Sequence, residues 1–334
     1  MLITPTPRTS AHASTGSSTA ALDGGLLDAV RSWRPSALAS TLAIVFTSLA
    51  FASTTIFVRQ LTDAGMSVVA VSFFRFALTA VVLLRFLNLT PPLRSATLWG
   101  LLSGVVMGAG WIVYVNTIDI ADVAVAGVVQ MTYPCFALLV GWLLFAVSPT
   151  VRSTASALLV VIAAIIGLGF GSGAELSPLL FVAPASFGFS VSVLTARLGP
   201  LDPFERLASV AVGASVAMAP LLLTLSPGEA LPTSLESVGW VLAIGAISAL
   251  IPMTIYAAAA PVIGTARTAA AGASELPTVF LIGAVFFGEA VTFGHLGAAV
   301  IIVGAIALTR SARSTHVVPD DDRERRALSN NSAV

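Results

Sequence analysis

Lysine is absent from the sequence, and cysteine occurs once, as Cys135. Because a disulfide needs two cysteines, none can form within the chain. Without lysine the chain cannot form the glycine-rich Gly-Lys-Ser/Thr loop that binds ATP phosphates, so ATP hydrolysis of the usual kind is excluded. The three histidines, His12, His295 and His316, lack the spacing of metal ligands, and no His-Glu-x-x-His run occurs. The sequence therefore predicts neither a metal ion nor a cofactor.

Charged residues are also scarce. They occupy 10% of the 334 positions, whereas hydrophobic residues occupy 57% and the mean hydropathy is +0.96. A soluble domain carries about a quarter charged residues. Here the charges gather at the chain ends and in short gaps between apolar stretches of about 20 residues, the length that crosses a hydrocarbon core of roughly 30 Å. Short alternating segments typical of barrel strands do not occur. The sequence therefore predicts an all-α membrane protein.

The apolar stretches predict ten transmembrane helices between two polar tails. Residues 1–35 are expected to be a disordered cytosolic tail, and residues 311–334 a second cytosolic tail. The expected spans are residues 37–58, 66–88, 97–116, 122–146, 155–172, 178–197, 204–225, 238–257, 265–288 and 293–309.

The arginines predict the orientation, because positively charged loops are retained in the cytosol. With the N-terminus inside, fourteen of the sixteen arginines fall on the cytosolic side, Arg59 falls outside, and Arg75 lies within a span. We therefore expect a multi-pass protein of the inner (cytoplasmic) membrane with both termini in the cytosol.

Two segments of the sequence are weakly similar. Residues 124–145 align with residues 267–288, and Pro134 then stands opposite Pro277 at an offset of 143 residues. Because each half has five spans, an odd number, equivalent helices must cross the membrane in opposite directions. Inverted repeats of this kind are a transporter architecture, with the solute site near the midplane. The two predicted five-helix halves are residues 36–173 and 174–310.

The end of the second half has a characteristic order of residues. Within residues 264–308, an alanine-rich helix is followed by Pro277, the Gly288-Glu289 pair, Thr292, Gly297 and Gly304. Together with Arg75 in the second span, this order resembles the EamA-type ten-helix permeases of the drug/metabolite transporter (DMT) superfamily, over about residues 40–310. The resemblance implies a membrane transporter and does not indicate the substrate. The first half departs from the pattern, because residues 146–149 hold no acidic residue where one is expected.

Two charged residues lie deep in predicted spans. Arg75 is near the middle of its span, where a charge costs roughly 2.5–3.5 kcal/mol and should face protein. It either receives an anionic group, such as a substrate carboxylate, or fixes helix packing through backbone carbonyls or a partner acid. Glu275 is the only carboxylate near the middle of a span. Its burial favours proton loading and release, and the alternatives are an ion pair with Arg75 or a neutral acid that donates one hydrogen bond.

Pro134 and Pro277 are expected to kink their helices at mid-depth. Proline removes one helical hydrogen bond, which should free the carbonyls of Gln130 and Ala273. Polar side chains lie beside both kinks. The predicted substrate-binding residues are Arg75, Gln130, Tyr133, Ser274 and Glu275.

Other residues are assigned to packing or to the membrane surface. Gly100, Gly104 and Gly108 recur every four residues and should let a neighbouring helix approach closely. Four aromatic residues near span ends are expected to be interfacial anchors. They are Trp111, Tyr114, Trp142 and Trp240. Trp111 or Tyr114 could instead line the outer vestibule.

The leading expectation is a secondary transporter, with export the expected direction, for a small metabolite, an amino-acid-like solute or an amphipathic compound. A gradient must drive it, and protons are the candidate coupling ion. A nucleotide-sugar-type exchanger would need several intramembrane cations, and Arg75 is the only one. An intramembrane enzyme would need a serine and a histidine at similar depth, which His295 lacks. A passive channel or a structural subunit is a further alternative.

The expected partners are the small-molecule substrate and the lipid bilayer. Nothing in the sequence points to nucleic acid, and a homodimer has no support in it.

Overall fold

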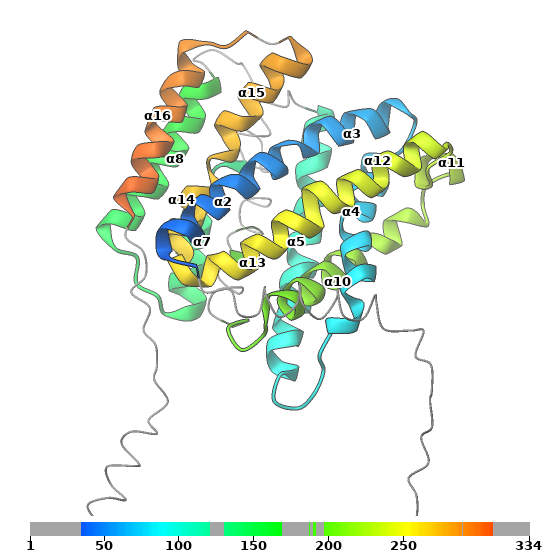
Figure 1. Cartoon of the computed structure of the whole chain (residues 1–334), viewed down its shortest axis with the longest axis horizontal. Helices are drawn as coiled ribbons and strands as arrows, with labels where there is room; N and C mark the ends of the chain where they lie inside the picture. Colours follow the sequence, from blue (N-terminus) through cyan, green and yellow to red (C-terminus); the bar gives the residue numbers. More distant parts are fainter. Residues whose placement is uncertain are drawn as a thin grey trace, which may run out of the picture. The chain divides into compact units, whose positions relative to one another are not determined.

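The computed structural model describes residues 35–120, 130–168, 187, 190–191, 197–288 and 290–309, without the side chains of residues 114–120, 168 and 287. The described residues form helices and no strands (Figure 1). From Pro35 onward they belong to one compact unit. The elements are α2 (Ala37–Ala52), α3 (Thr54–Asp63), α4 (Val68–Leu83), the 3₁₀ turn η1 (Leu84–Phe86), α5 (Arg94–Ile120), α7 (Tyr133–Phe145), α8 (Val151–Leu168), α10 (Pro203–Leu222), α11 (Pro227–Ala230), α12 (Leu235–Gly245), the π-helix η2 (Ala246–Leu250), α13 (Ile251–Ile263), α14 (Thr265–Gly272), α15 (Glu275–Phe287) and α16 (Phe293–Leu308).

Six helical runs among the described residues are long and apolar enough to cross a membrane. They are residues 37–63, 68–86, 94–113, 203–222, 235–263 and 265–286. The shorter apolar helices α7, α8 and α16 also fall on predicted spans. The helical, membrane-spanning character is thereby confirmed, and the count of ten stays a prediction.

Several predicted features lie outside the described residues. They are the two tails apart from Pro35, residues 122–129 of the fourth span, residues 169–172 of the fifth, most of the sixth span, Glu289 and the side chain of Tyr114.

Two predicted spans were too short. The first continues past residue 58 as α3, and the eighth reaches from Leu235 to Ile263. The apolar run marks only the part of a helix in hydrocarbon, whereas the end of α3 is polar and carries an ion pair of 3.5 Å between Arg59 and Asp63. Such i,i+4 pairs support a helix outside the membrane core, where hydropathy gives no signal.

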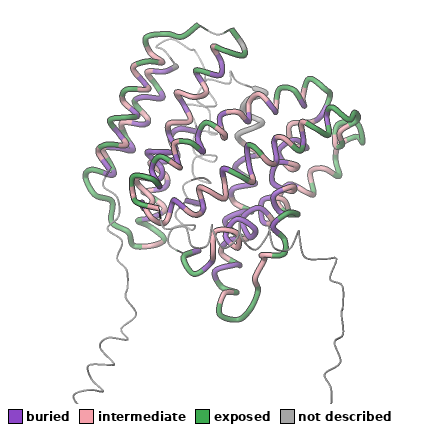
Figure 2. Tube along the Cα trace, in the orientation of Figure 1, coloured by how far each residue is buried: buried purple, intermediate pink, exposed green. Residues whose placement is uncertain are grey.

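Glycines of α5 bring it directly against α10, as predicted. A methyl group on Gly104 would collide with the backbone carbonyl of Val210, and one on Gly108 would lie 2.9 Å from the carbonyl oxygen of Ala214. Contacts this close are available only to residues without a side chain. Figure 2 shows buried residues where α5 and α10 meet.

The helices α4 and α10 run antiparallel and are joined at both ends. Asn88 Nδ2, just after α4, donates to Glu205 Oε1 in the first turn of α10 at 3.0 Å. At the other end, Ser67 N donates to Glu229 O at 2.9 Å. Residues 63–67 and 226–234 therefore lie on the same side of the membrane.

Two further helix pairs lie side by side in Figure 1, α2 with α13 and α8 with α16. The outward faces of α8 and α16 are exposed and apolar (Figure 2). They carry Leu158, Ile162 and Ile165 on α8 and Leu296, Val300 and Val303 on α16. In a membrane such faces meet lipid chains.

Candidate functional site

Two helices are interrupted in the interior of the protein. A turn at residues 131–132 precedes α7, and a turn at residues 273–274 separates α14 from α15. Pro134 and Pro277 lie in the first turn of the helix that follows each break. Proline is tolerated there because the first-turn N–H groups have no partner within the helix. The breaks therefore occur where the sequence placed them.

The helices that follow the two breaks, α7 and α15, match in length and in their ends, although Pro134 and Pro277 are not at equivalent positions in them. Both α7 and α15 have 13 residues and end at a left-handed residue, Ala146 (φ 54°) and Gly288 (φ 70°). The first residues, Tyr133 and Glu275, and these end residues are each 142 positions apart. The alignment at an offset of 143 was therefore wrong by one residue, because it matched the prolines and not the helix ends. In the structural register, Tyr133 corresponds to Glu275.

Tyr133 connects the two breaks. Its buried hydroxyl donates to the carbonyl of Ala269 in α14 at 2.7 Å. The same hydroxyl fills the space beside Gly272, where a methyl group would collide with it. The side chain that starts α7 therefore packs on the last turn of α14, directly before the second break.

The remaining polar groups at the breaks differ in how they are bonded. Gln130 is buried, and its side-chain oxygen accepts no hydrogen bond from the described part of the chain. The Ser274 hydroxyl donates to Ala271 O at 2.7 Å. The expectation of a free Ala273 carbonyl was wrong, because the backbone tightens and Leu276 N donates to it at 3.1 Å. Gln130 is thus the side chain here with unused capacity to accept a hydrogen bond.

Glu275 is the first residue of α15, directly after the second break. It is only half-buried, although it lies deep among the helices. Its carboxyl group is close enough to interact electrostatically with Tyr133, Tyr256 and Arg75. The described residues nevertheless contain no direct ion pair between Glu275 and Arg75. A carboxyl group in this position can reach a solute or a proton.

Arg75 is held by backbone and by aromatic rings. Its Nη2 donates to the carbonyl of Ser248 in the π-helix η2 at 2.9 Å. Its guanidinium lies 4.4 Å from the ring centre of Trp111. A π-helix shifts the backbone hydrogen bonds and often marks a functional site. The bond to Ser248 O is of the kind that the packing role of Arg75 predicted. The role of Arg75 in substrate binding stays a prediction.

Aromatic side chains connect Arg75 to Tyr133 and Glu275. On one side, Trp111 lies 6.1 Å from Phe187, which lies 6.0 Å from Tyr133, measured between ring centres. On the other side, Arg75 lies 5.8 Å from the ring of Phe51, which is 6.2 Å from that of Tyr256. Glu275 interacts electrostatically with both Tyr133 and Tyr256. We call these seven residues the aromatic ring: Phe51, Arg75, Trp111, Tyr133, Phe187, Tyr256 and Glu275.

The assignment of Trp111 as an interfacial anchor was wrong. It is buried, and its Nε1 donates to Ser72 Oγ at 3.2 Å. In contrast, Trp142 is 52% exposed on the outside of α7, as expected of an anchor. Phe51, Phe187 and Tyr256 were not singled out in the sequence, because an aromatic residue in an apolar run looks the same whether it faces lipid or a cavity.

Two arginines of the cytosolic count are built into the protein. Arg206 is buried and donates to the carbonyls of Gly199, Leu201 and Ala257 at 2.8–3.0 Å. Arg267 Nε donates to Thr41 Oγ1 at 2.8 Å, which joins α14 to α2. These arginines therefore join helix ends and loops as well as contributing positive charge.

Comparisons with known proteins agree with these features. Residues 38–168 match the EamA-like transporter family, of the DMT superfamily. This confirms the resemblance, although most residues quoted for it lie in the second half. A solved crystal structure of a protein 18% identical in sequence has a TM-score of 0.63, over 80% of this chain and 95% of that chain, which shows a shared fold. No curated protein matches the chain. The chain is a multi-pass membrane protein, and its residues 38–168 are similar to the EamA-like transporter family.

Proposed function

Because residues 38–168 match the EamA-like transporter family, we propose that the chain is a secondary transporter of a small organic solute, and that the solute binds within the aromatic ring. The observation that carries the proposal is the position of this ring. It lies at two helix breaks, and it combines one cation with one carboxylate that is only half-buried. Broken helices at membrane depth are tolerated where they line a cavity, and transporters bind solutes there.

The helix contacts support two inverted halves. If α4, α5, α7 and α8 correspond to α10, α12–α13, α15 and α16, exchanging the halves converts one contact into another. The contact of α5 with α10 becomes that of α4 with α12, and α7 with α8 becomes α15 with α16. The pairs α4–α10 and α8–α16 map onto themselves. This pattern is expected of a two-fold axis in the membrane plane, and alternating access is its usual consequence.

The chemistry of the ring indicates the class of solute. Aromatic faces bind apolar or cationic groups, Arg75 binds a carboxylate, and Glu275 binds an ammonium group or a proton. A small neutral, zwitterionic or singly charged metabolite fits these groups. A nucleotide sugar fits less well, because among the described ring residues Arg75 is the only cation.

Glu275 is the proposed coupling group. A half-buried carboxyl group deep in the protein, with no direct ion pair to any residue that the structure describes, can take up a proton on one side of the membrane and release it on the other. The arginine asymmetry supports an orientation with both termini in the cytosol. Export across the cytoplasmic membrane, driven by a proton gradient, is the direction that we propose.

The test begins with purified full-length protein and a panel of small metabolites. A compound that binds the folded state raises the apparent unfolding temperature. Each stabilising compound is then tested for counterflow in proteoliposomes preloaded with the same unlabelled compound. A carrier accumulates labelled compound transiently, whereas a channel only equilibrates it. Equilibration without overshoot, for every compound that binds, would contradict the proposal.

A further inference from the structure

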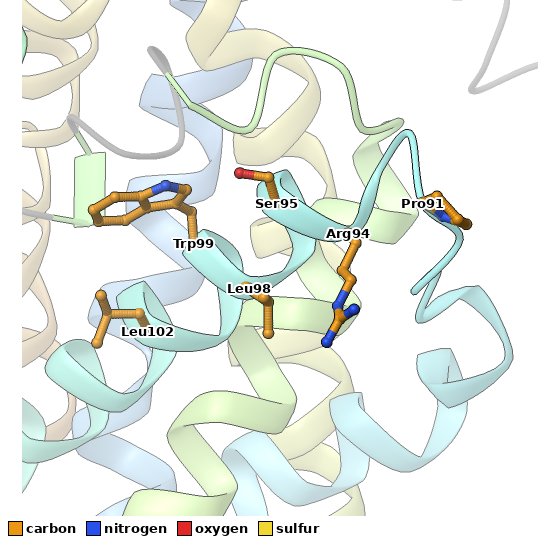
Figure 3. Close-up of a pocket in the computed structure, with 6 residues that line it drawn as sticks. All are labelled: Pro91, Arg94, Ser95, Leu98, Trp99 and Leu102. Carbon is orange, nitrogen blue, oxygen red and sulfur yellow. The ribbon is translucent and has the colours of Figure 1, made fainter.

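A pocket of about 420 Å³ lies at the start of α5 (Figure 3), and none of its lining residues belongs to the aromatic ring. Its volume is in the range of roughly 300–1,000 Å³ typical of sites for small ligands. Side chains of α5 and of the preceding loop line it. They are Pro91, Arg94, Ser95, Leu98, Trp99 and Leu102.

The apolar wall of this pocket faces outward. Leu98 and Leu102 are 49% and 46% exposed, whereas the glycine face of α5 is buried against α10. Exposed leucines on a helix of membrane length meet the acyl chains of lipids. The pocket is therefore a recess in the lipid-facing surface, at the level where α5 leaves the hydrocarbon core.

The other end of the pocket is basic. Arg94 lines the pocket and is exposed (Figure 3). Arg197 is not a lining residue, and its guanidinium lies between two aromatic side chains, 5.7 Å from the ring centre of Trp99 and 5.4 Å from that of Phe145. No acidic residue lines the pocket. The nearby Glu205 already accepts hydrogen bonds from Asn88 Nδ2 and Asp202 N. Two arginines beside a half-buried tryptophan at this depth match the chemistry of a phospholipid headgroup and its glycerol backbone.

We propose that this pocket binds an anionic phospholipid. The phosphate group contacts Arg94 and Arg197, the glycerol region packs on Trp99 and Ser95, and one acyl chain lies along Leu98 and Leu102. The site is separate from the aromatic ring and does not depend on which solute is transported. With the arginine-rich side in the cytosol, the bound lipid belongs to the inner leaflet.

Fluorescence of Trp99 tests the proposal directly. The full-length protein is reconstituted in phosphatidylcholine vesicles that contain a minor fraction of a brominated lipid. This lipid is either brominated phosphatidylglycerol or brominated phosphatidylcholine. The bromine atoms on the acyl chains quench the fluorescence of nearby tryptophans. The difference between the wild type and Trp99→Phe isolates the Trp99 signal. We expect brominated phosphatidylglycerol to quench Trp99 at several-fold lower mole fraction than brominated phosphatidylcholine.

Charge variants make the test specific. A basic residue near an anionic lipid surface contributes a factor of roughly five in affinity. Arg94→Gln and Arg197→Gln should each reduce the preference for phosphatidylglycerol by about that factor. Arg59→Gln is the matched control, because Arg59 is exposed at the opposite end of the protein, and it should change nothing. Soluble glycerol phosphate should not compete, because it lacks the acyl chain.

Two results would overturn the proposal. One is equal quenching of Trp99 by the two brominated lipids, which would make the recess an unselective lipid contact. The other is absence of quenching by either lipid, which would mean that another part of the chain or a second copy fills the pocket.

Discussion

At the scale of single residues, Tyr133 and Glu275 are the central pair, because they are the first residues of the two corresponding helices α7 and α15. Tyr133 and Glu275 each follow a helix break, and the Tyr133 hydroxyl also bonds to the segment before the other break. A solute bound here, as proposed, would touch both breaks at once. Its position would then be coupled to the conformation of the two helices.

Tyr133→Ala should abolish binding of the transported solute and leave expression near normal, because it removes one face of the aromatic ring. Tyr133→Phe keeps the aromatic side chain and loses the hydrogen bond of the hydroxyl, and such a bond contributes about 1 kcal/mol to stability. It should bind the solute almost as well as the wild type. Binding is measured by the ligand-induced rise in unfolding temperature, with Trp142→Ala, on the lipid-facing side, as the control. Unchanged binding in Tyr133→Ala would place the site elsewhere.

The stabilities of Glu275 and Arg75 variants test whether the two residues pair. Removing one partner of a buried ion pair costs roughly 3–5 kcal/mol. Since the structure has no such pair, Glu275→Gln should lower the free energy of unfolding by less than about 1 kcal/mol. Arg75→Gln should cost more, about 2–4 kcal/mol, because it loses the bond to Ser248 O and the stacking on Trp111.

Thermal or denaturant unfolding of both single variants and the double variant gives the coupling energy. A double variant that recovers most of the stability lost by Glu275→Gln would show that the residues pair after all.

Sequence reasoning at this scale found the polar residues and missed the aromatic ones. Gln130, Tyr133 and Glu275 stand out because polar groups in a span are costly. Phe51 and Tyr256 do not, since their contact joins positions 205 residues apart. Trp111 was misassigned because its position along the span does not show whether it faces lipid or the interior, where its Nε1 donates to Ser72 Oγ.

At the scale of helices, close packing of α5 on α10 holds the ring residues of α4 and α5 in place. Both α4 and α5 contact α10, and Arg75 and Trp111 project from these two helices. The glycines at the α5–α10 contact therefore determine the geometry of the site from a distance.

Gly104→Ala should destabilise the protein by about 1–3 kcal/mol or more, because the added methyl group meets the backbone of Val210, which cannot rotate away. Gly304→Ala in α16 is the matched control, since nothing lies within 4 Å of its added methyl group. It should be neutral or slightly stabilising, because alanine favours helix more than glycine does. Thermal unfolding of both variants checks this. Equal stability of the two would mean that the α5–α10 contact is looser than the structure indicates.

The sequence predicted most of the helices and both breaks, because apolar runs and prolines mark them directly. It did not predict the π-helix η2 or the turn at Ser53. These irregularities depend on tertiary contacts, such as the bond from Arg75 to Ser248 O, which no local pattern encodes. The register of the repeat was missed by one residue for a similar reason, because a proline can occupy more than one position in a first turn.

At the scale of the whole molecule, the orientation can be tested with a reporter enzyme active only outside the cytosol. A fusion at residue 334 should be inactive, since the arginine count keeps both termini inside. A fusion in the loop of residues 226–234 should be active. That loop bonds to residues 63–67 through Ser67 N and Glu229 O, so a second fusion between residues 63 and 67 should give the same result. Strong activity at residue 334 would contradict the orientation and the even number of spans.

The central claim is that Glu275 couples solute movement to protons at a site between the two halves. The most direct measurement compares wild-type and Glu275→Gln protein in proteoliposomes, in two assays with the same labelled solute. The substitution keeps the size and most hydrogen bonding of the side chain and removes its titration. We predict that Glu275→Gln abolishes uphill transport driven by a pH gradient and retains exchange of solute for solute. Uphill transport at the wild-type rate in Glu275→Gln would contradict the account.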